Sequence, residues 1–509
     1  MLCLAFTCMA LYMYFVSRHR ILWSDELFGW MLLTDPDVHH MLAGWRAGAD
    51  GGGLLFYLLG RLWLLCFGRS DMAFRAFSAA GCFAGFSFAW FALRRNYRAG
   101  LVAVTLFLVW FGSRTILWQM VQTRFYGMLL GAAAFALYVA IRSAQETATG
   151  APARLQTLAL NLLAHLLLVG THPFGIAYSA LILSGSALSD IAHRTWRPAF
   201  YLTGILPWSL LWFSREAMRN SARMGKPHFW TTTPTPDDLS HMYMPDAIPF
   251  IGYIALAFIV LTLLWPTRRR TFWRAAKQRS HILLPALLLS LTPLFLWIIS
   301  QRGTSLFVDR YMVPFTLGIA VFGVEALTLI FPQGPLAAPF WLKFVGAGWI
   351  AYMLFCVAQD SVVDYPAKLD FPPLDFTPSL AQQLPRGIPV VFERPEEFDV
   401  MLHQQSAPNL PMFYLLDWDT AIAPESPRGV VSGYKEMETW RQVGYFSDSI
   451  VDSDKFLNTI NDFIVVDDAN ILWFERRILH NPRWDIQKLS DYRHGFWSET
   501  IWKVHRRQP

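Results

Sequence analysis

Long apolar runs fill the first 358 residues of this 509-residue chain and alternate with short polar stretches. A helix crosses the hydrocarbon layer of a bilayer with about 20 apolar residues, and most of these runs approach that length. They predict about eleven membrane spans, at roughly 1–16, 72–93, 100–113, 126–142, 156–170, 174–190, 199–213, 248–265, 281–300, 311–331 and 341–358. The pattern therefore predicts a mainly α-helical fold, a polytopic transmembrane bundle.

The apolar run 53–67 differs from these runs because it is shorter and contains Arg61. We expect it to form a helix that lies along the membrane interface. Two polar segments between the runs are long, 17–71 and 214–247. A long connection without clear secondary-structure signals is typical of a lid or binding loop, or else of a plain connector, and the sequence leaves both open.

The last 151 residues, 359–509, have a different pattern. Strands are predicted at 388–392, from 411 onward, and at 462–466 and 470–474, and helices at 396–404, 434–444 and 453–460. Such alternation predicts a small α/β domain. We therefore expect two domains, a transmembrane domain over 1–358 and a soluble domain over 359–509. The five cysteines lie in or beside apolar runs, so no disulfide framework is expected.

The charge distribution separates the same two parts. Residues 1–358 carry 28 Lys+Arg and 14 Asp+Glu, whereas residues 359–509 carry 15 and 23. Arginines gather after the second, sixth and eighth expected spans, and basic loops of this kind face the cytoplasm. The N-terminus is then inside and the soluble domain outside. Because the basic residues are spread over short loops, they fit membrane lipid head groups and not nucleic acid.

Asp25 and Glu26 stand next to each other at the point where the chain leaves the first expected span. A carboxylate there can pair with a cation, bind a metal or accept a proton from a substrate. Partial burial raises the pKa of a carboxyl group and nearby arginines lower it, which is the balance that a general base requires. An ion pair with Arg18 or Arg20 is the alternative.

Further motifs follow this pair in a recognisable order. They are Leu55-Phe56-Tyr57, Gly68-Arg69-Ser70-Asp71, Arg75-Ala76-Phe77-Ser78-Ala79, Arg124-Phe125-Tyr126, Thr171-His172-Pro173-Phe174-Gly175 and Arg310-Tyr311 with Pro314. The order resembles that of the GT-C glycosyltransferases, the superfamily of protein O-mannosyltransferases and lipid A aminoarabinose transferases. Where the family tends to have Pro-Pro before the interfacial helix, this chain has Gly51-Gly52-Gly53.

The resemblance implies a multi-pass enzyme of the cytoplasmic (inner) membrane. It would transfer a sugar from a polyprenyl-phosphate donor to a hydroxyl group of a glycan, lipid or protein acceptor outside that membrane, with inversion. Asp25 would be the catalytic base, with Glu26 as the second candidate. The residues expected to bind substrate are Arg75, Arg124, Tyr126, His172, Arg302, Arg310 and Tyr311. Arginines suit the leaving phosphate because the guanidinium fork matches its oxygens, although each could instead be an interfacial arginine.

No metal ligand is assigned, but a divalent cation is a possible cofactor. Asp35, Asp37, His39 and His40 have a spacing compatible with one. Two other function classes remain: a transporter or lipid flippase, and a non-catalytic scaffold of envelope assembly. The chain shows no paired halves with matching broken spans, which disfavours a transporter. The acid pair Asp25-Glu26 disfavours a scaffold.

Overall fold

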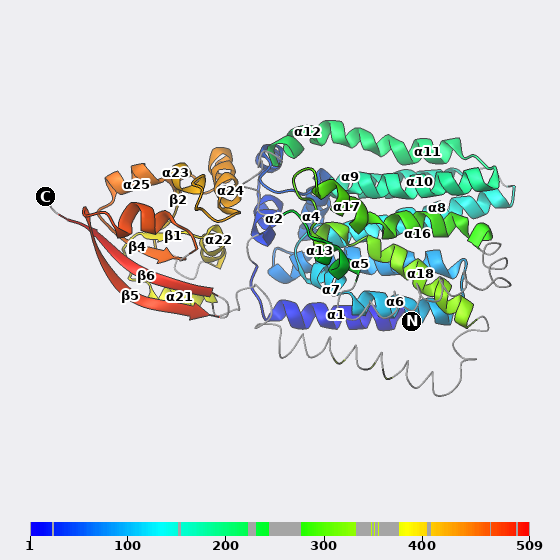
Figure 1. The fold of residues 1–509 in the computed structure, drawn as a ribbon, viewed down its shortest axis with the longest axis horizontal. Coiled ribbons are helices and arrows are strands. Elements are labelled where there is room, and N and C mark those ends of the chain that lie inside the picture. The colour runs from blue at the N-terminus through cyan, green and yellow to red at the C-terminus, as the bar shows by residue number, and fades with distance from the viewer. Residues whose placement is uncertain are drawn as a thin grey trace. The chain divides into compact units, whose positions relative to one another are not determined.

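The computed structural model describes residues 2–22, 25–150, 154–221, 231–243, 276–331, 376–404, 409–468, 470–494 and 497–507, with 348, 351 and 355 (Figure 1). It divides into two compact units. We call residues 1–15, 52–214 and 233–361 the helical unit, and residues 16–51, 215–232 and 362–509 the sheet unit. The first long polar segment is thus grouped largely with the C-terminal part of the chain.

Helices form at the described apolar runs, and a further helix forms at Pro236–Tyr243, within the polar segment 214–247. They are α1 (Leu2–Arg18), α4 (Leu54–Phe67), α5 (Asp71–Arg94), α6 (Ala99–Gly112), α7 (Arg114–Val121), α8 (Tyr126–Ala148), α9 (Leu155–Thr171), α10 (Gly175–His193), α11 (Pro198–Ile205), η1 (Leu206–Ser209), α12 (Leu210–Ser221), α13 (Pro236–Tyr243), α16 (Ser280–Ser290), α17 (Thr292–Ser300), η2 (Asp309–Met312) and α18 (Phe315–Ile330). The run expected to lie along the interface is α4. The expected span 248–265, and all but three residues of 341–358, lie outside the described residues.

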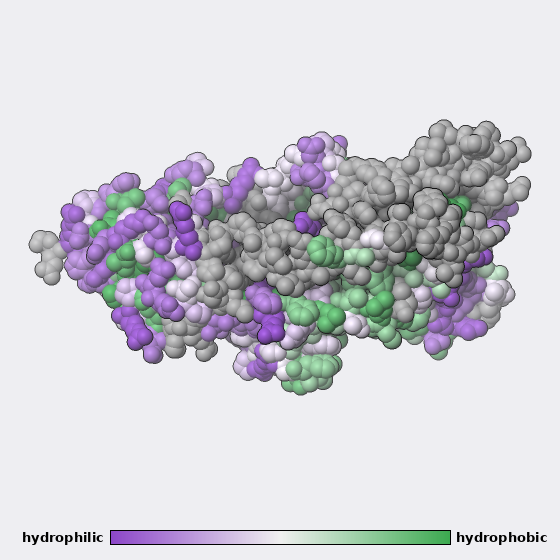
Figure 2. Space-filling view, turned by 90° about the horizontal axis from the view of Figure 1, so that it is seen from below, coloured by the Kyte–Doolittle hydropathy of each residue, from purple (hydrophilic) through white to green (hydrophobic). Residues whose placement is uncertain are grey.

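Within the described residues, four helices are long and apolar enough to cross a membrane: Asp71–Arg94, Tyr126–Ala148, Gly175–His193 and Ser280–Ser300. The pair α6 and α7, bent by 68°, adds a fifth if it is one span. Apolar side chains gather on the surface of this unit, whereas the sheet unit is largely polar (Figure 2). Leu65, Phe67 and Phe213 are 79%, 62% and 70% exposed. Such side chains are stable at a surface that faces lipid.

α5 and α8 pack backbone against backbone. A Cβ atom added at Gly81 would lie 2.4 Å from the carbonyl carbon of Gly127, and one added at Gly127 would lie 2.3 Å from the carbonyl oxygen of Ser78. Close packing of small residues is a principal source of stability between helices in a membrane, where the hydrophobic effect does not drive helices together. The same contact fixes the N-terminal end of α8, which begins at Tyr126.

The sheet unit has the expected α/β architecture. Its elements are α2 (Asp25–Thr34), α3 (Val38–Ala47), α21 (Phe376–Gln383), β1 (Val390–Phe392), α22 (Pro395–Gln404), β2 (Met412–Leu416), α23 (Trp418–Ala421), α24 (Val430–Val443), β3 (Ile450–Asp452), α25 (Ser453–Thr459), β4 (Asp462–Asp467), the π-helix η5 (Glu475–Leu479), β5 (Trp484–His494) and β6 (Trp497–Arg506). The strand order is β3-β2-β1-β4-β6-β5. β1 to β4 are parallel, and the hairpin β5–β6 adds to β4 in antiparallel fashion.

The strand predicted at 470–474 is wrong, because Trp473 and Phe474 start a helical turn that continues into η5. Phe474 and Ile478 are buried together in one core cluster, and their spacing of four is helical. The pattern also missed β5 and β6. Their outward residues are polar and charged, as is usual for a hairpin with one solvated face.

The first polar segment packs on the helices of the sheet unit. The His40 ring lies 4.4 Å from the Tyr445 ring, centroid to centroid, and His40 Nε2 is 2.9 Å from the carbonyl oxygen of Val443. Phe28 contacts Trp440, with 5.9 Å between ring centroids. Residues 16–51 are therefore an integral part of this unit, which the composition of the segment does not indicate.

Two groups should make the sheet unit more stable at mildly acidic pH than at alkaline pH. The hydrogen bond to the Val443 carbonyl and the charge of Asp35 raise the pKa of His40. Burial raises the pKa of Glu499 to about 7. Both groups bind their proton more tightly in the folded state. The stabilisation from His40 is full below the unfolded pKa of 6.5 and is lost as pH rises through its raised pKa. The cost from Glu499 is absent below 4.5 and complete above about 7.

We therefore expect hydrogen-exchange protection of the amides in β4 and β6 of the full chain, corrected for intrinsic exchange, to fall by at least about ten-fold between pH 5 and pH 8. Glu499→Gln should remove part of this decline, because other buried carboxyl groups of the unit, such as Glu397, also have raised pKa values. A protection factor that is constant or rises with pH in the wild-type chain would refute the assignment.

Candidate functional site

Five residues expected to bind substrate meet in the helical unit. Tyr126 begins α8, His172 lies in the turn between α9 and α10, and Tyr311 lies in η2. The ring centroids of Tyr126 and His172 are 5.7 Å apart, and Tyr311 lies 5.9 Å from each. The guanidinium carbon of Arg310 is 6.0 Å from the Tyr126 ring centroid, and that of Arg124 is 4.7 Å from the Phe125 ring centroid. We call Arg124, Tyr126, His172, Arg310 and Tyr311 the arginine–aromatic cluster.

Hydrogen bonds from neighbouring helices hold the backbone of this cluster. Ser78 Oγ on α5 donates to the carbonyl oxygen of Arg124 at 2.7 Å. The hydroxyl of Tyr178 on α10 donates to the carbonyl oxygen of Tyr311 at 2.6 Å. These bonds come from buried residues of long helices, so the cluster is preorganised.

The glycines that replace the family's Pro-Pro have a structural reason. The Gly53 amide donates to the carbonyl oxygen of Thr171 at 2.8 Å, and a Cβ atom on Gly53 would lie 2.2 Å from the carbonyl oxygen of Gly170. The Gly52 amide donates to the hydroxyl oxygen of Tyr57 at 3.2 Å. Proline could donate neither bond. The segment before α4 is thus tied directly to the turn that carries His172.

His172 is a neutral hydrogen-bonding group. Burial, together with the charges of Arg124 and Arg310, lowers the pKa of His172 to about 3. Its Nδ1 accepts a hydrogen bond from the Phe174 amide at 3.1 Å, which assigns the proton to Nε2. The cluster therefore combines two guanidinium groups with a neutral N–H donor, a set suited to an anionic oxygen.

One of the expected arginines is not part of this arrangement. Arg302 follows α17, and its exposed side chain makes no hydrogen bond or ion pair with any described residue. Arg75 is buried on α5. The sequence could not separate Arg302 from Arg124 and Arg310, because all three stand near apolar runs.

Asp25 and Glu26 occupy the first turn of α2 in the sheet unit. Glu26 is buried, and its Oε1 accepts from Arg20 Nη2 at 3.1 Å, so the ion-pair alternative holds for this residue. Asp25 is half-buried. Burial raises the pKa of Glu396, and the charge of Asp25 adds to this shift. The two acids therefore have different surroundings.

The residues considered for a cation at 35–40 are engaged in local structure. His40 Nδ1 is 2.6 Å from Asp35 Oδ2, and its other ring nitrogen contacts the Val443 carbonyl. Asp37 Oδ1 accepts from the His39 amide at 2.8 Å and caps α3. No group of three metal-ligating side chains is formed there among the described residues.

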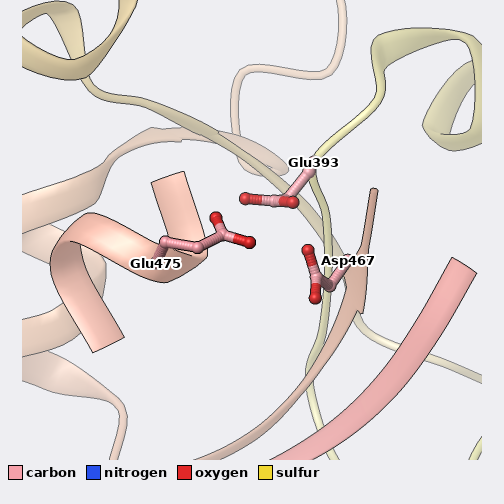
Figure 3. A group of neighbouring side chains, drawn as sticks. All are labelled: Glu393, Asp467 and Glu475. Atoms are coloured by element: carbon pink, nitrogen blue, oxygen red, sulfur yellow. The ribbon is translucent and has the colours of Figure 1, made fainter. Parts of the chain in front are cut away.

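Sequence reasoning missed a different carboxylate group, Glu393, Asp467 and Glu475 (Figure 3). Each offers one oxygen within 4.8 Å of the others, which is close enough to hold a metal ion. Glu393 and Asp467 stand at the carboxyl ends of the parallel strands β1 and β4, where the strand order reverses and where ligands of α/β sheets bind. Burial and the charge of Asp467 raise the pKa of Glu393 well above its usual range. Glu393 is distant in sequence from Asp467 and Glu475, so no local motif could reveal the group.

Two crystal structures of ArnT from Cupriavidus metallidurans are similar to this chain. The structure bound to undecaprenyl phosphate has a TM-score of 0.59 and 12% identity, over 98% of this chain and 97% of that chain. The apo structure has a TM-score of 0.59 and 14% identity with the same coverage. The chain shares the fold of these two structures. This confirms the fold class expected from the order of the motifs, and the apolar helices make the chain a multi-pass membrane protein.

Archaeal oligosaccharyltransferase AglB from Archaeoglobus fulgidus, in complex with an inhibitory peptide and a dolichol-phosphate, matches at a TM-score of 0.48 and 10% identity, over 91% of this chain and 69% of that chain. Scans of the sequence against protein-family models and against curated proteins find no match. The fold shared with ArnT is therefore recognised from the structure.

Proposed function

We propose that the chain is a GT-C glycosyltransferase that moves a sugar from a polyprenyl-phosphate donor to an acceptor hydroxyl outside the cytoplasmic membrane, with inversion. In this proposal residues 1–358 are the transmembrane catalytic domain and 359–509 a soluble extracytoplasmic domain. The observation that carries it is the arginine–aromatic cluster, in which residues from three separate sequence motifs meet within a GT-C fold. The fold's similarity to ArnT bound to undecaprenyl phosphate supports the same donor class.

The cluster supplies what the leaving group requires. When the bond between the sugar's anomeric carbon and the phosphate oxygen breaks, the electron pair goes to the polyprenyl phosphate. Arg124 and Arg310 stabilise this charge, and their two forks can each bind a pair of phosphate oxygens. The Nε2 proton of neutral His172 adds a donor without adding charge. Arg75 is kept as a secondary contact to substrate, whereas Arg302, whose side chain lies outside the cluster, is not assigned to the phosphate.

Asp25 is the proposed base. Its carboxylate takes the proton of the acceptor hydroxyl as the acceptor oxygen attacks the anomeric carbon on the face opposite the phosphate, so the configuration inverts. Glu26 is the second candidate, and its carboxylate binds Arg20.

The test of the activity is product release. The purified full chain is incubated with undecaprenyl phosphates carrying different sugars and with an envelope extract as acceptor, and free undecaprenyl phosphate is measured by mass spectrometry. We expect one donor to be consumed in an acceptor-dependent manner. If the chain binds undecaprenyl phosphate but consumes no donor, a lipid flippase is the better description. If it does neither, the scaffold alternative replaces the proposal.

Arginine substitutions test the cluster itself. Arg310→Ala should weaken the binding of undecaprenyl phosphate by about 10- to 100-fold, because one charge-assisted pair contributes about 1.5–3 kcal/mol. Arg310→Lys should recover only part of the loss, since an ammonium group lacks the fork. Arg302→Ala is the control, and its affinity should change by less than about two-fold. Native mass spectrometry of the lipid-bound chain gives the affinities. Equal losses for Arg302→Ala and Arg310→Ala would exclude the cluster as the phosphate site.

A further inference from the structure

A cavity of about 770 Å³ lies in the sheet unit. Its lining comes from α25, η5, the turn before β5 and the end of β6. Five arginines line it: Arg476, Arg477, Arg483, Arg506 and Arg507. Residues 359–509 contain 15 Lys+Arg against 23 Asp+Glu, so a third of the cations of an acidic segment surround one cavity. Because like charges repel, a cluster of five arginines destabilises the fold unless the arginines bind an anion.

Three of these arginines are held in place by the surrounding structure. The guanidinium carbon of Arg506 lies 5.1 Å from the centroid of the Trp484 ring, and its Nη2 donates to the carbonyl oxygen of Leu457. Arg477 pairs with Asp417 at 3.1 Å and also with Asp454, and Arg476 pairs with Glu425 at 3.1 Å. Their positions are therefore fixed before any ligand binds, which lowers the entropic cost of binding.

The other two arginines are not engaged. The side chains of Arg483 and Arg507 are exposed and make no hydrogen bond or ion pair with any described residue. The Arg507 amide donates to the Arg483 carbonyl oxygen at 2.9 Å, so the two residues are adjacent in space. Five guanidinium groups face three carboxylates in the ion pairs described above. Two positive charges thus remain uncompensated.

We propose that this cavity binds a phosphate group carried by a glycan or by a lipid head group. A phosphate monoester is close to a dianion at neutral pH and matches the two uncompensated charges, and its oxygens match the guanidinium forks. The volume falls in the range of small-ligand pockets, so a sugar attached to the phosphate also fits. The amides of Asn458 and Asn481 in the lining can bind sugar hydroxyls. The inference concerns the sheet unit alone and does not depend on the donor cluster.

The test uses the full chain in a neutral detergent at fixed ionic strength. Calorimetric titration with inorganic phosphate, glucose 1-phosphate and glucose tests the shared chemistry, and mixed micelles containing phosphatidic acid or phosphatidylcholine test the lipid source. We expect glucose 1-phosphate or phosphatidic acid to bind and glucose and phosphatidylcholine not to bind. Preference for glucose 1-phosphate identifies a glycan source, and preference for phosphatidic acid identifies a lipid source.

A charge-matched pair of double variants completes the test. Arg483→Gln with Arg507→Gln should weaken binding of the preferred phosphate ligand at least about ten-fold, because both side chains are exposed and their loss leaves the fold intact. Lys488→Gln with Arg493→Gln removes the same charge from β5 outside the cavity and should change affinity by less than about two-fold. Absence of binding by the wild-type chain, or equal loss in both double variants, would overturn the proposal.

Discussion

Replacing Asp25 with asparagine is expected to lower turnover of the polyprenyl-phosphate sugar by about 10²- to 10⁴-fold, the usual contribution of a general base. Asparagine has the same shape as aspartate but cannot accept the acceptor's proton. The affinity for undecaprenyl phosphate should stay within about two-fold of wild type, because Arg124 and Arg310 are unchanged. Asp25 lies in the first turn of α2, where loss of its charge costs less than about 1 kcal/mol of helix stability.

Two further variants make this result specific. Glu26→Gln removes the partner of buried Arg20 and should destabilise the sheet unit by about 3–5 kcal/mol, while the folded fraction keeps its turnover. Asp37→Asn changes an exposed cap of α3 and should alter neither property, since asparagine caps helices as well as aspartate. Turnover is measured as release of undecaprenyl phosphate per folded chain. If Asp25→Asn retains turnover and Glu26→Gln loses it, the base is Glu26.

The helices could be predicted from the sequence because each apolar run has to satisfy its own backbone within the bilayer. α8 and α10 follow the expected spans 126–142 and 174–190 to within a few residues at each start. The parallel strands β1 and β4 could be predicted because they are buried on both faces and read as continuous apolar runs. The same rule fails at Trp473 and Phe474. This part of the chain is also apolar, but it begins a helical turn.

Site residues could be predicted only where a motif marks them. Arg124 and Arg310 stand in recognisable motifs at the mouths of spans, and the structure brings them to His172. Arg302 is also an arginine near the end of an expected span, as Arg124 and Arg310 are, yet its side chain lies outside the cluster. Motif order carries no information on the direction of a side chain.

Groups that depend on tertiary pairing could not be predicted at all. Glu393 and Asp467 become neighbours because β1 and β4 pair in parallel, with Phe392 opposite Val466, and this pairing joins segments that are distant in sequence. Likewise, Arg483 precedes β5 and Arg507 follows β6, so they meet at the open end of the hairpin, opposite its turn. The sequence pattern did not reveal this hairpin. A charge count showed only that the C-terminal part is acidic. It could not show that its arginines gather around one cavity.

A leucine at Gly81 is expected to prevent the helical unit from folding to its native packing. The added Cβ atom alone would lie 2.4 Å from backbone atoms of Gly127 and Met128, and backbone cannot move aside as a side chain can. α5 and α8 would have to separate, with a loss of contacts along both helices that we place at about 4 kcal/mol or more. The Ser78 bond to the Arg124 carbonyl lies at the same contact, so the arginine–aromatic cluster should open as well.

The matched comparison is alanine at Gly81 against alanine at Gly51. A Cβ atom on Gly51 meets no other atom within 4 Å, so Gly51→Ala should leave the melting temperature unchanged or slightly raised. Gly81→Ala should lower the melting temperature of the detergent-solubilised chain, and Gly81→Leu should abolish recovery of monodisperse protein on size exclusion. Gly81→Ala should also weaken undecaprenyl phosphate binding, since the displaced α8 begins at Tyr126. If Gly81→Ala and Gly51→Ala have the same melting temperature, α5 and α8 do not touch in the folded protein. The preorganisation proposed for the phosphate site then has no structural support.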